Sequence, residues 1–183
     1  MADPKILKQE LVFNGGHIKV RVDRVIEPAG HEATREIVVH SGAVCIVARP
    51  TDSEVLLVRQ YRHSTGGDLL EIPAGGLDPG EDPLDAARRE LEEETGYHLG
   101  PVTKLFAAYM SPGSVTEKVH FFAAPYTPAQ RKSAGGGVVD HGEEIELVEL
   151  GLDQALQMIE SGEIQDGKTI MLLQHAKLKG LVE

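Results

Sequence analysis

The stretch GGLDPGEDPLDAARRELEEETGY, residues 75–97, decides the central element of the fold. A proline opens its second half, a glycine closes it, and no β-branched residue lies between them before the single threonine. Leu84, Ala87 and Leu91 recur at helical spacing and so form one apolar face. Proline suits the first turn of a helix, and glycine suits the position after its last turn. We therefore predict a helix over Pro83–Thr95.

Three acids share another face of this predicted helix. Glu90 and Glu94 are four residues apart and Glu93 lies beside Glu90, so their carboxylates converge. Like charges so close cost an isolated helix roughly 0.2–0.5 kcal/mol per pair, and they raise one another's pKa unless a cation intervenes. Hard oxygen ligands at this spacing suit Mg²⁺ or Mn²⁺, and Arg89 could pair with one carboxylate and fix its position. The alternative is a solvated acidic face, which a run of like charges usually forms.

Short apolar or alternating runs on both sides of this helix predict strands, and the C-terminal end predicts two helices. The strands are expected at Gly42–Arg49, Glu54–Arg62, Asp68–Pro73, Val102–Met110, Val119–Ala124 and Ile145–Leu150, and the helices at Leu152–Glu163 and Asp166–Leu178. A glycine-rich segment, residues 134–144, has the composition of a mobile loop. Strands, one helix, more strands and terminal helices favour an α+β fold with a mixed sheet over a doubly wound repeat.

The first 40 residues show a separate pattern. His17–Val22 alternates apolar and polar residues, Arg35–His40 is rich in β-branched residues, and glycine-containing turn signals flank these runs. We predict a β-meander or small separate sheet over residues 1–40, followed by a main domain over residues 41–183. The strands of such a small sheet need something to cover them.

The composition excludes several classes of protein. With 18 Lys and Arg against 29 Asp and Glu, the net charge of −11 repels a polyanion, so no nucleic-acid partner is expected. One cysteine, Cys45, excludes an intramolecular disulfide framework and a cysteine-based zinc site. No apolar run approaches the roughly 18 residues of a membrane span. The first ten residues lack the apolar core of a signal peptide, so we expect a cytoplasmic protein with no membrane partner.

Residues 75–97 also resemble a known motif. They fill every fixed position of the Nudix box, GX5EX7REUXEEXGU, where U is a bulky apolar residue. The strand order around the box fits the rest of the family domain. The resemblance implies a Nudix αβα sandwich around a mixed β-sheet, within the α+β class, with a small N-terminal β-sheet. It also implies hydrolysis of a diphosphate that is joined to two other groups.

The same resemblance implies roles for individual residues. The groups that would hold Mg²⁺, with Mn²⁺ possible, are the backbone oxygen of Ala74 and the side chains of Glu90, Glu93 and Glu94. Glu93 is either a further ligand or an acid behind the ligands, Glu81 is an accessory acid, and Arg89 orients the carboxylates. Divalent ions would neutralise the diphosphate and activate water, so an acidic protein could hold an anionic substrate.

The flanking residues narrow the substrate by resemblance. The segment LLEIPAGGLDPGE, residues 69–81, and Pro112, sixteen residues after the box glycine, are similar to ADP-ribose and other nucleoside-diphosphate-sugar pyrophosphatases. Pro112 alone could also be an ordinary turn proline. Arg62 resembles the arginine that contacts the substrate diphosphate, and a guanidinium suits phosphate. Glu71, an interior acid that must find a cation or ligand, and Glu117 are further candidates near the substrate.

The general base is expected in the acidic loop before a late strand. Glu143 and Glu144 are both candidates, and the register does not choose between them. The triple glycine at 135–137 would let this loop close over the substrate and bring a base to the water. Either acid could equally be a solvated loop residue.

These observations lead to one main hypothesis and three alternatives. The main hypothesis is a metal-dependent enzyme that hydrolyses ADP-ribose to AMP and ribose 5-phosphate. The alternatives are a pyrophosphatase for another nucleoside diphosphate sugar, such as GDP-mannose or a UDP-sugar, a sensor that binds a nucleotide sugar without cleaving it, and an acidic structural domain with no ligand. The resemblance also implies a homodimer formed through the N-terminal strands.

Overall fold

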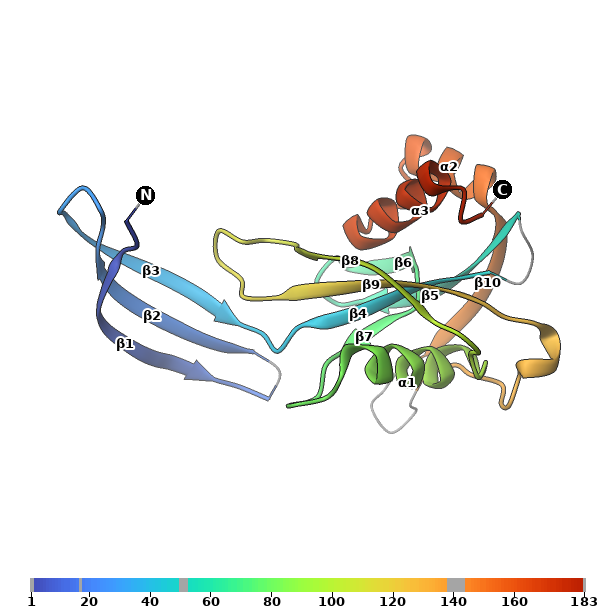
Figure 1. Cartoon of the computed structure of the whole chain (residues 1–183), viewed down its shortest axis with the longest axis horizontal. Helices are drawn as coiled ribbons and strands as arrows, with labels where there is room; N and C mark the ends of the chain where they lie inside the picture. Colours follow the sequence, from blue (N-terminus) through green and yellow to red (C-terminus); the bar gives the residue numbers. More distant parts are fainter. Residues whose placement is uncertain (1, 17, 50–52, 138–143, 183) are drawn as a thin grey trace. The chain divides into compact units, whose positions relative to one another are not determined.

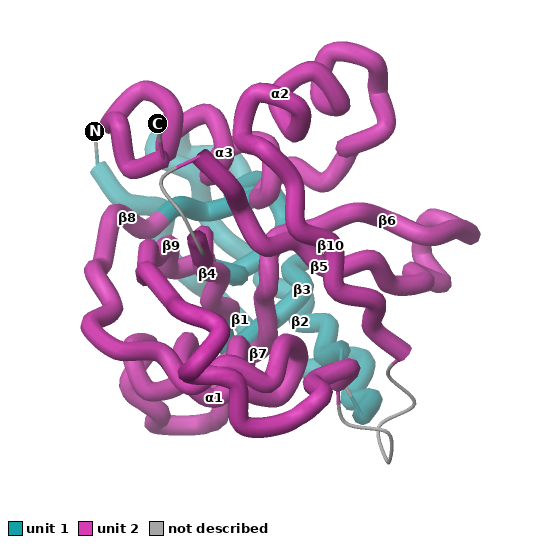
Figure 2. Tube along the Cα trace, turned by 90° about the vertical axis from the view of Figure 1, so that its right-hand side faces the viewer, with its two compact units in different colours: residues 1–42, 108–118 teal, residues 43–107, 119–183 magenta. Residues whose placement is uncertain are grey.

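The computed structural model describes residues 2–16, 18–49, 53–137 and 144–182. The chain divides into two compact units, which Figure 2 shows in different colours. Unit 1 comprises residues 1–42 and 108–118, and unit 2 comprises residues 43–107 and 119–183.

Unit 1 contains a three-stranded antiparallel sheet in the order β1-β2-β3 (Figure 1). Its strands are β1 (Lys5–Asn14), β2 (Lys19–Ile26) and β3 (Glu32–Val39). The pairing of β2 with β3 is regular, whereas the pairing of β1 with β2 contains two register shifts. Val38 in β3 also forms an isolated parallel bridge to Val115, so the segment around Val115 lies beside this sheet. The small N-terminal sheet was predicted from the sequence, and a domain boundary at residue 40 stays a prediction.

Within the described residues, unit 2 is built on a seven-stranded mixed sheet. The strands are β4 (Ala43–Arg49), β5 (Glu54–Arg62), β6 (Gly67–Glu71), β7 (Ala74–Gly76), β8 (Thr103–Tyr109), β9 (Lys118–Pro125) and β10 (Ile145–Gly151). The order is β10-β5-β4-β9-β8, with β6 beside β5 and β7 beside β4. The pairing of β4 with β9 is parallel, whereas β5 pairs with β10 and with β6 in the antiparallel sense.

Three α-helices described in unit 2 cover this sheet, and a short 3-10 helix, η1 (Pro128–Gln130), follows β9. The helix α1 (Pro83–Thr95) lies on one face, and α2 (Leu152–Ser161) and α3 (Gly167–Lys179) lie on the other (Figure 1). The side chain of Asp82 accepts a hydrogen bond from the backbone N–H of Leu84 and caps the start of α1. No described helix has the length and apolar character that crossing a membrane requires.

The core lies on both faces of the central strand β4. On the face toward α1, apolar side chains of the sheet and the helix pack together. They include Val44, Ile46 and Ala48 of β4 and Ala86, Ala87 and Leu91 of α1. On the other face, the ring of Phe106 stacks on that of Phe121 at a centroid distance of 4.4 Å and lies 4.7 Å from the ring of His175 in α3. A strand covered on both faces explains why β4 reads as a continuous apolar run.

The α+β class with a mixed sheet and a small separate sheet is confirmed. The bounds of α1 match the predicted ones, because proline, helical periodicity and glycine are all local signals. The short strand β7 was not predicted, because a run of one alanine and two glycines carries no strand propensity. Its pairing with β4 comes from tertiary structure alone. The backbone of β7 lies against side chains of α1.

Candidate functional site

Arg89 is the centre of an acidic cluster on α1 and the loop before it. Its Nε and Nη2 atoms donate to the two carboxylate oxygens of Glu81 at 3.0 and 2.9 Å. Its Nη1 atom donates to Glu90 at 2.8 Å and lies 3.4 Å from a carboxylate oxygen of Glu93. The guanidinium also donates to the backbone oxygen of Gly76 at 3.1 Å. One cation thus gathers three acids, where the sequence suggested that it would pair with one.

This cluster shifts the titration of its members. Two hydrogen bonds from Arg89, together with one from the backbone N–H of Asp78, lower the pKa of Glu81 to about 2. The hydrogen bond to Glu81 and the nearby charge of Glu90 raise the pKa of Arg89 above its ordinary value. Glu81 therefore stays ionised through the whole neutral and mildly acidic range.

The carboxylates of Glu90 and Glu94 lie against the backbone of β7. The backbone N–H of Ala74 donates to Glu94 at 3.0 Å, and Glu94 is buried with 5% of its surface exposed. A Cβ atom placed on Gly75 would lie 1.9 Å from the Cδ atom of Glu90. The box therefore needs glycine at position 75, because any larger residue would displace this carboxylate.

The triple glycine is held against the end of α1. Gly136 donates its backbone N–H to the backbone oxygen of Glu94 at 2.8 Å. Gly137 donates its backbone N–H to the backbone oxygen of Glu93 at 3.2 Å. The backbone N–H of Ile145, at the start of β10, donates to the oxygen of Gly136 at 3.2 Å. Gly136 and Gly137 thus satisfy helix carbonyls, since an α-helix leaves its last oxygens without partners. The closure of this loop over a substrate stays a prediction.

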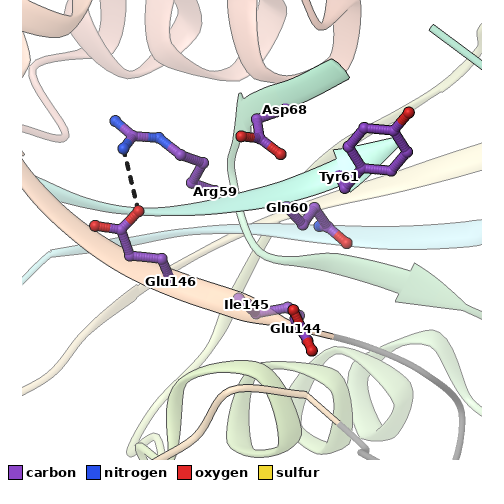
Figure 3. A pocket seen from close by; sticks show the side chains of 7 residues that line it. All are labelled: Arg59, Gln60, Tyr61, Asp68, Glu144, Ile145 and Glu146. Atoms are coloured by element: carbon purple, nitrogen blue, oxygen red, sulfur yellow. Dashed lines mark hydrogen bonds and ion pairs between the residues drawn. The ribbon is translucent and has the colours of Figure 1, made fainter. Parts of the chain in front are cut away.

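Glu144, a candidate base, lies next to this connection at the start of β10. It lines an open cavity of about 350 Å³ between β5, β6 and β10. Figure 3 shows its lining residues, which are Arg59, Gln60, Tyr61, Asp68, Glu144, Ile145 and Glu146. The backbone of Ile145, the next residue after Glu144, is hydrogen-bonded to Gly136, and Gly136 is hydrogen-bonded to Glu94. Two hydrogen bonds therefore connect the backbone beside Glu144 to the acidic helix. The other candidate, Glu143, lies outside the described residues.

Arg62 and Glu71, the predicted phosphate-binding arginine and the interior acid, form an ion pair. The Nε and Nη2 atoms of Arg62 donate to Glu71 at 2.6 and 2.9 Å, and Lys168 also donates to Glu71. Burial would raise the pKa of Glu71, but the hydrogen bond from Arg62 and the charge of Lys168 outweigh burial and hold that pKa below its ordinary value. Two cationic side chains, those of Arg62 and Lys168, thus neutralise the interior acid Glu71.

Pro112 and Glu117 lie in unit 1. Pro112 lines a cavity of about 410 Å³ together with residues of β3 and of the segment 109–116. Glu117 lies with a carboxylate oxygen 3.5 Å from the Nδ1 atom of His40. Their roles near a substrate stay predictions.

Comparison with known proteins identifies the family. A model of the NUDIX domain matches residues 39–173. The chain belongs to the Nudix family. It is 40% identical over 177 residues to the methanol dehydrogenase activator of Bacillus methanolicus, covering 97% of this chain and 94% of that protein.

Two further similarities concern proteins whose names state a substrate. The chain is 46% identical over 149 residues to the GDP-mannose pyrophosphatase of Escherichia coli O1:K1 / APEC, covering 78% of this chain and 76% of that protein. A crystal structure described as that of an ADP compounds hydrolase aligns with a TM-score of 0.82 and 26% identity. That alignment covers 99% of this chain and 97% of the other chain.

Nudix hydrolases in general use divalent metal ions. Among the described residues, no three acidic, histidine or cysteine side chains are grouped so that they could hold a metal ion alone. The donor types nevertheless fit such an ion, because Glu90, Glu93 and Glu94 offer hard oxygens on one helix end beside the backbone of Ala74. The charge of Arg89 already holds Glu90 and Glu93 together despite their repulsion.

The Nudix site has neighbours that the sequence did not predict. At the start of α3, Lys168 contacts Glu71 and Thr169 contacts Ile72, the residue after it. Asp166 pairs with Lys168. The signal for them was indirect: a buried acid requires a cation, but nothing in the sequence indicates which lysine supplies it.

Replacing Gly75 by alanine tests the contact between β7 and α1. Because the new Cβ would overlap the Glu90 carboxylate, we expect Gly75→Ala to lower kcat/KM by about 10- to 100-fold. The melting temperature should change little, since a flexible side-chain end can move and the backbone of Gly75 has no positive φ. Gly76→Ala is the matched control, because its Cβ would meet nothing within 4 Å. Equal activity of the two variants would contradict this account.

The low pKa of Glu81 predicts a specific acid sensitivity. A group whose pKa falls from 4.5 to about 2 on folding stabilises the fold above its unfolded pKa, and this contribution is lost as the pH falls toward 2. Wild type should therefore be more stable than Glu81→Gln near neutral pH, and the difference should shrink at about pH 3. Urea unfolding of both proteins across this range measures the difference. A difference independent of pH would refute the prediction.

Proposed function

We propose that this Nudix hydrolase cleaves the diphosphate of a nucleoside diphosphate sugar in a reaction that needs a divalent metal ion. The observation that carries the proposal is the intact box, folded so that Arg89 contacts the carboxylates of Glu90 and Glu93 and the Glu90 carboxylate lies against Gly75. The names of the relatives, a GDP-mannose pyrophosphatase and an ADP compounds hydrolase, support the same substrate class.

The proposed metal is Mg²⁺, with Mn²⁺ as a substitute. The groups that would hold it are the backbone oxygen of Ala74 and the carboxylates of Glu90, Glu93 and Glu94. When bound, such an ion supplies positive charge that offsets the charge of the diphosphate. Arg89 orients the carboxylates, because it contacts two of these side chains and Glu81 at once.

Other residues would bind the substrate and move a proton. Arg62 would bind the diphosphate, since a guanidinium places paired N–H donors opposite phosphate oxygens. Glu144 or Glu143 would accept the proton of the attacking water. The position of Glu144, connected to α1 through Gly136, supports it as one of the two candidates. Glu71 supports Arg62, and Pro112 and Glu117 remain proposed substrate neighbours.

Two substrates of this class have specific support. ADP-ribose is supported by the residues around the box and by the structural likeness to an ADP compounds hydrolase, and it would give AMP and ribose 5-phosphate. GDP-mannose is supported by the higher identity, 46%, to a GDP-mannose pyrophosphatase, and it would give GMP and mannose 1-phosphate. Both reactions use the same chemistry at the Nudix box. The preference for one substrate therefore depends on how the protein binds the nucleobase and the sugar.

A substrate screen tests the proposal. With Mg²⁺ present, we expect kcat/KM for ADP-ribose or GDP-mannose to exceed that for UDP-sugars. Glu93→Gln and Glu94→Gln should each lower it by about 100-fold, because a ligand carboxylate is lost. Glu92→Gln is the matched control, because the side chain of Glu92 is 44% exposed and pairs with His98 at 2.7 Å. Full turnover in both variants, or no turnover of any nucleotide sugar by wild type, would refute the proposal.

We also propose that residues 1–40 form a dimerisation element. The support is a set of apolar side chains at 43–56% exposure on β1 and beside it, namely Ile6, Leu7, Leu11, Val12, Phe13 and Ile18. Single exposed apolar residues are common on protein surfaces, whereas several on one short stretch of chain support the presence of an interaction surface. The cytoplasmic location expected from the sequence stays a prediction.

The dimer can be tested by its mass in solution. We expect wild type to elute as a dimer, and Leu11→Glu to elute as a monomer because a charge would enter the apolar surface. Glu10→Gln, at the neighbouring exposed position, is the control and should stay dimeric. Light scattering after size exclusion gives the mass. A monomeric wild type would overturn the proposal.

A further inference from the structure

A buried network of charges lies outside the Nudix box, between β5, β6 and the start of α3. At its centre is Glu71, which is 1% exposed and has both carboxylate oxygens engaged. Arg62 donates to both oxygens, and Lys168 donates to one of them. The Nζ atom of Lys168 also lies 2.9 Å from Asp166. Two acids and two bases thus make a network without net charge.

The same helix end holds the backbone that leads into the box. The hydroxyl of Thr169 accepts a hydrogen bond from the backbone N–H of Ile72 at 2.9 Å. The Thr169 hydroxyl in turn donates to the carboxylate of Asp166 at 2.6 Å. Ile72 stands two residues before Ala74, whose N–H donates to Glu94. The first turn of α3 is therefore connected through one short stretch of backbone to the acidic helix.

Arg62 is the exposed member of the network. Its side chain is 37% exposed, whereas those of Lys168 and Glu71 are 19% and 1% exposed. The guanidinium uses its Nε and Nη2 atoms on Glu71, which leaves the donors of Nη1 on its other side. A guanidinium fixed in this way can offer a phosphate a donor edge without losing its partner.

We propose that Lys168, together with Asp166, is a positioning residue that keeps Arg62 oriented toward the substrate diphosphate. The proposal rests on the proposed function of Arg62. With Lys168 in place, Glu71 shares its charge between two cations. Without Lys168, the buried carboxylates would keep an excess negative charge, and Arg62 would be drawn inward to neutralise it. Lys168 itself lies too deep in the network to serve as the main phosphate contact.

The test is a kinetic comparison of variants on the substrate that wild type hydrolyses. Lys168→Met should raise KM by about tenfold while kcat changes much less, because substrate binding loses an oriented guanidinium. Lys168→Arg keeps the charge and should restore KM to within about twofold of wild type. Lys177→Met is the matched control on the same helix, since Lys177 is exposed and pairs with Asp153. It should leave KM unchanged.

A double variant separates positioning from general stability. In an Arg62→Ala background, Lys168→Met should add no further rise in KM, because the residue that it positions is gone. An equal rise in KM in both backgrounds would overturn the proposal. If Lys168→Met does not fold, as judged by circular dichroism and melting temperature, Lys168→Gln carries the same expectation. A Lys168→Arg enzyme whose KM is raised by tenfold or more would also overturn it.

The outcomes distinguish this inference from the proposed function. If wild type hydrolyses no nucleotide sugar, the proposed function fails and the positioning role fails with it. If wild type is active but Lys168→Met keeps the wild-type KM, only the positioning role fails. Both the proposed function and the positioning role are supported if Lys168→Met raises KM, Lys168→Arg does not, and Lys168→Met adds no further rise in an Arg62→Ala background.

Discussion

The repulsion among the acids of α1, and its compensation by Arg89, is the constraint on which the site depends. An acidic face of this kind would disfavour the helix if its charges faced only one another. Arg89 contacts Glu81, Glu90 and Glu93 and also bonds the backbone of Gly76, so it links the helix to the loop before it. Because a guanidinium stays charged and Glu81 stays ionised above its pKa of about 2, the link between them persists through the neutral and mildly acidic range.

Close backbone approach is the second requirement, and Gly75 and Gly135 are two of the glycines that permit it. At Gly75 the Glu90 carboxylate occupies the space of a side chain, so the strand β7 and α1 fit together. At Gly135 a Cβ would lie 2.5 Å from the backbone of Thr95, and the φ of +69° favours glycine as well. Together with the hydrogen bond from Ile145 to Gly136, these contacts bring β7, the end of α1 and the start of β10 close to one another. A site for a small substrate needs such close positioning of its elements.

The sequence predicts most of the fold because its signals are local. The apolar run of β4, the helical period of α1 and the terminal helices all follow from the side chains of single segments. The box predicts the acids and Gly75 as one group, since the motif records their spacing. The contacts of the triple glycine were not predictable, because composition shows that glycines are flexible but not that the N–H groups of Gly136 and Gly137 face the end of α1.

By itself, the sequence determined the elements, the acidic helix face and the Nudix box, since neighbours along a helix or strand set these. Only the tertiary structure decided which distant groups meet. Glu71 and Lys168 are 97 residues apart, and the sequence shows that Glu71 needs a cation without showing which one reaches it. Arg89 likewise contacts three acids because the loop before α1 folds back onto the helix. The physical reason is that the sequence gives the chemistry of each side chain, whereas the distance between two side chains far apart in the sequence depends on how the elements pack.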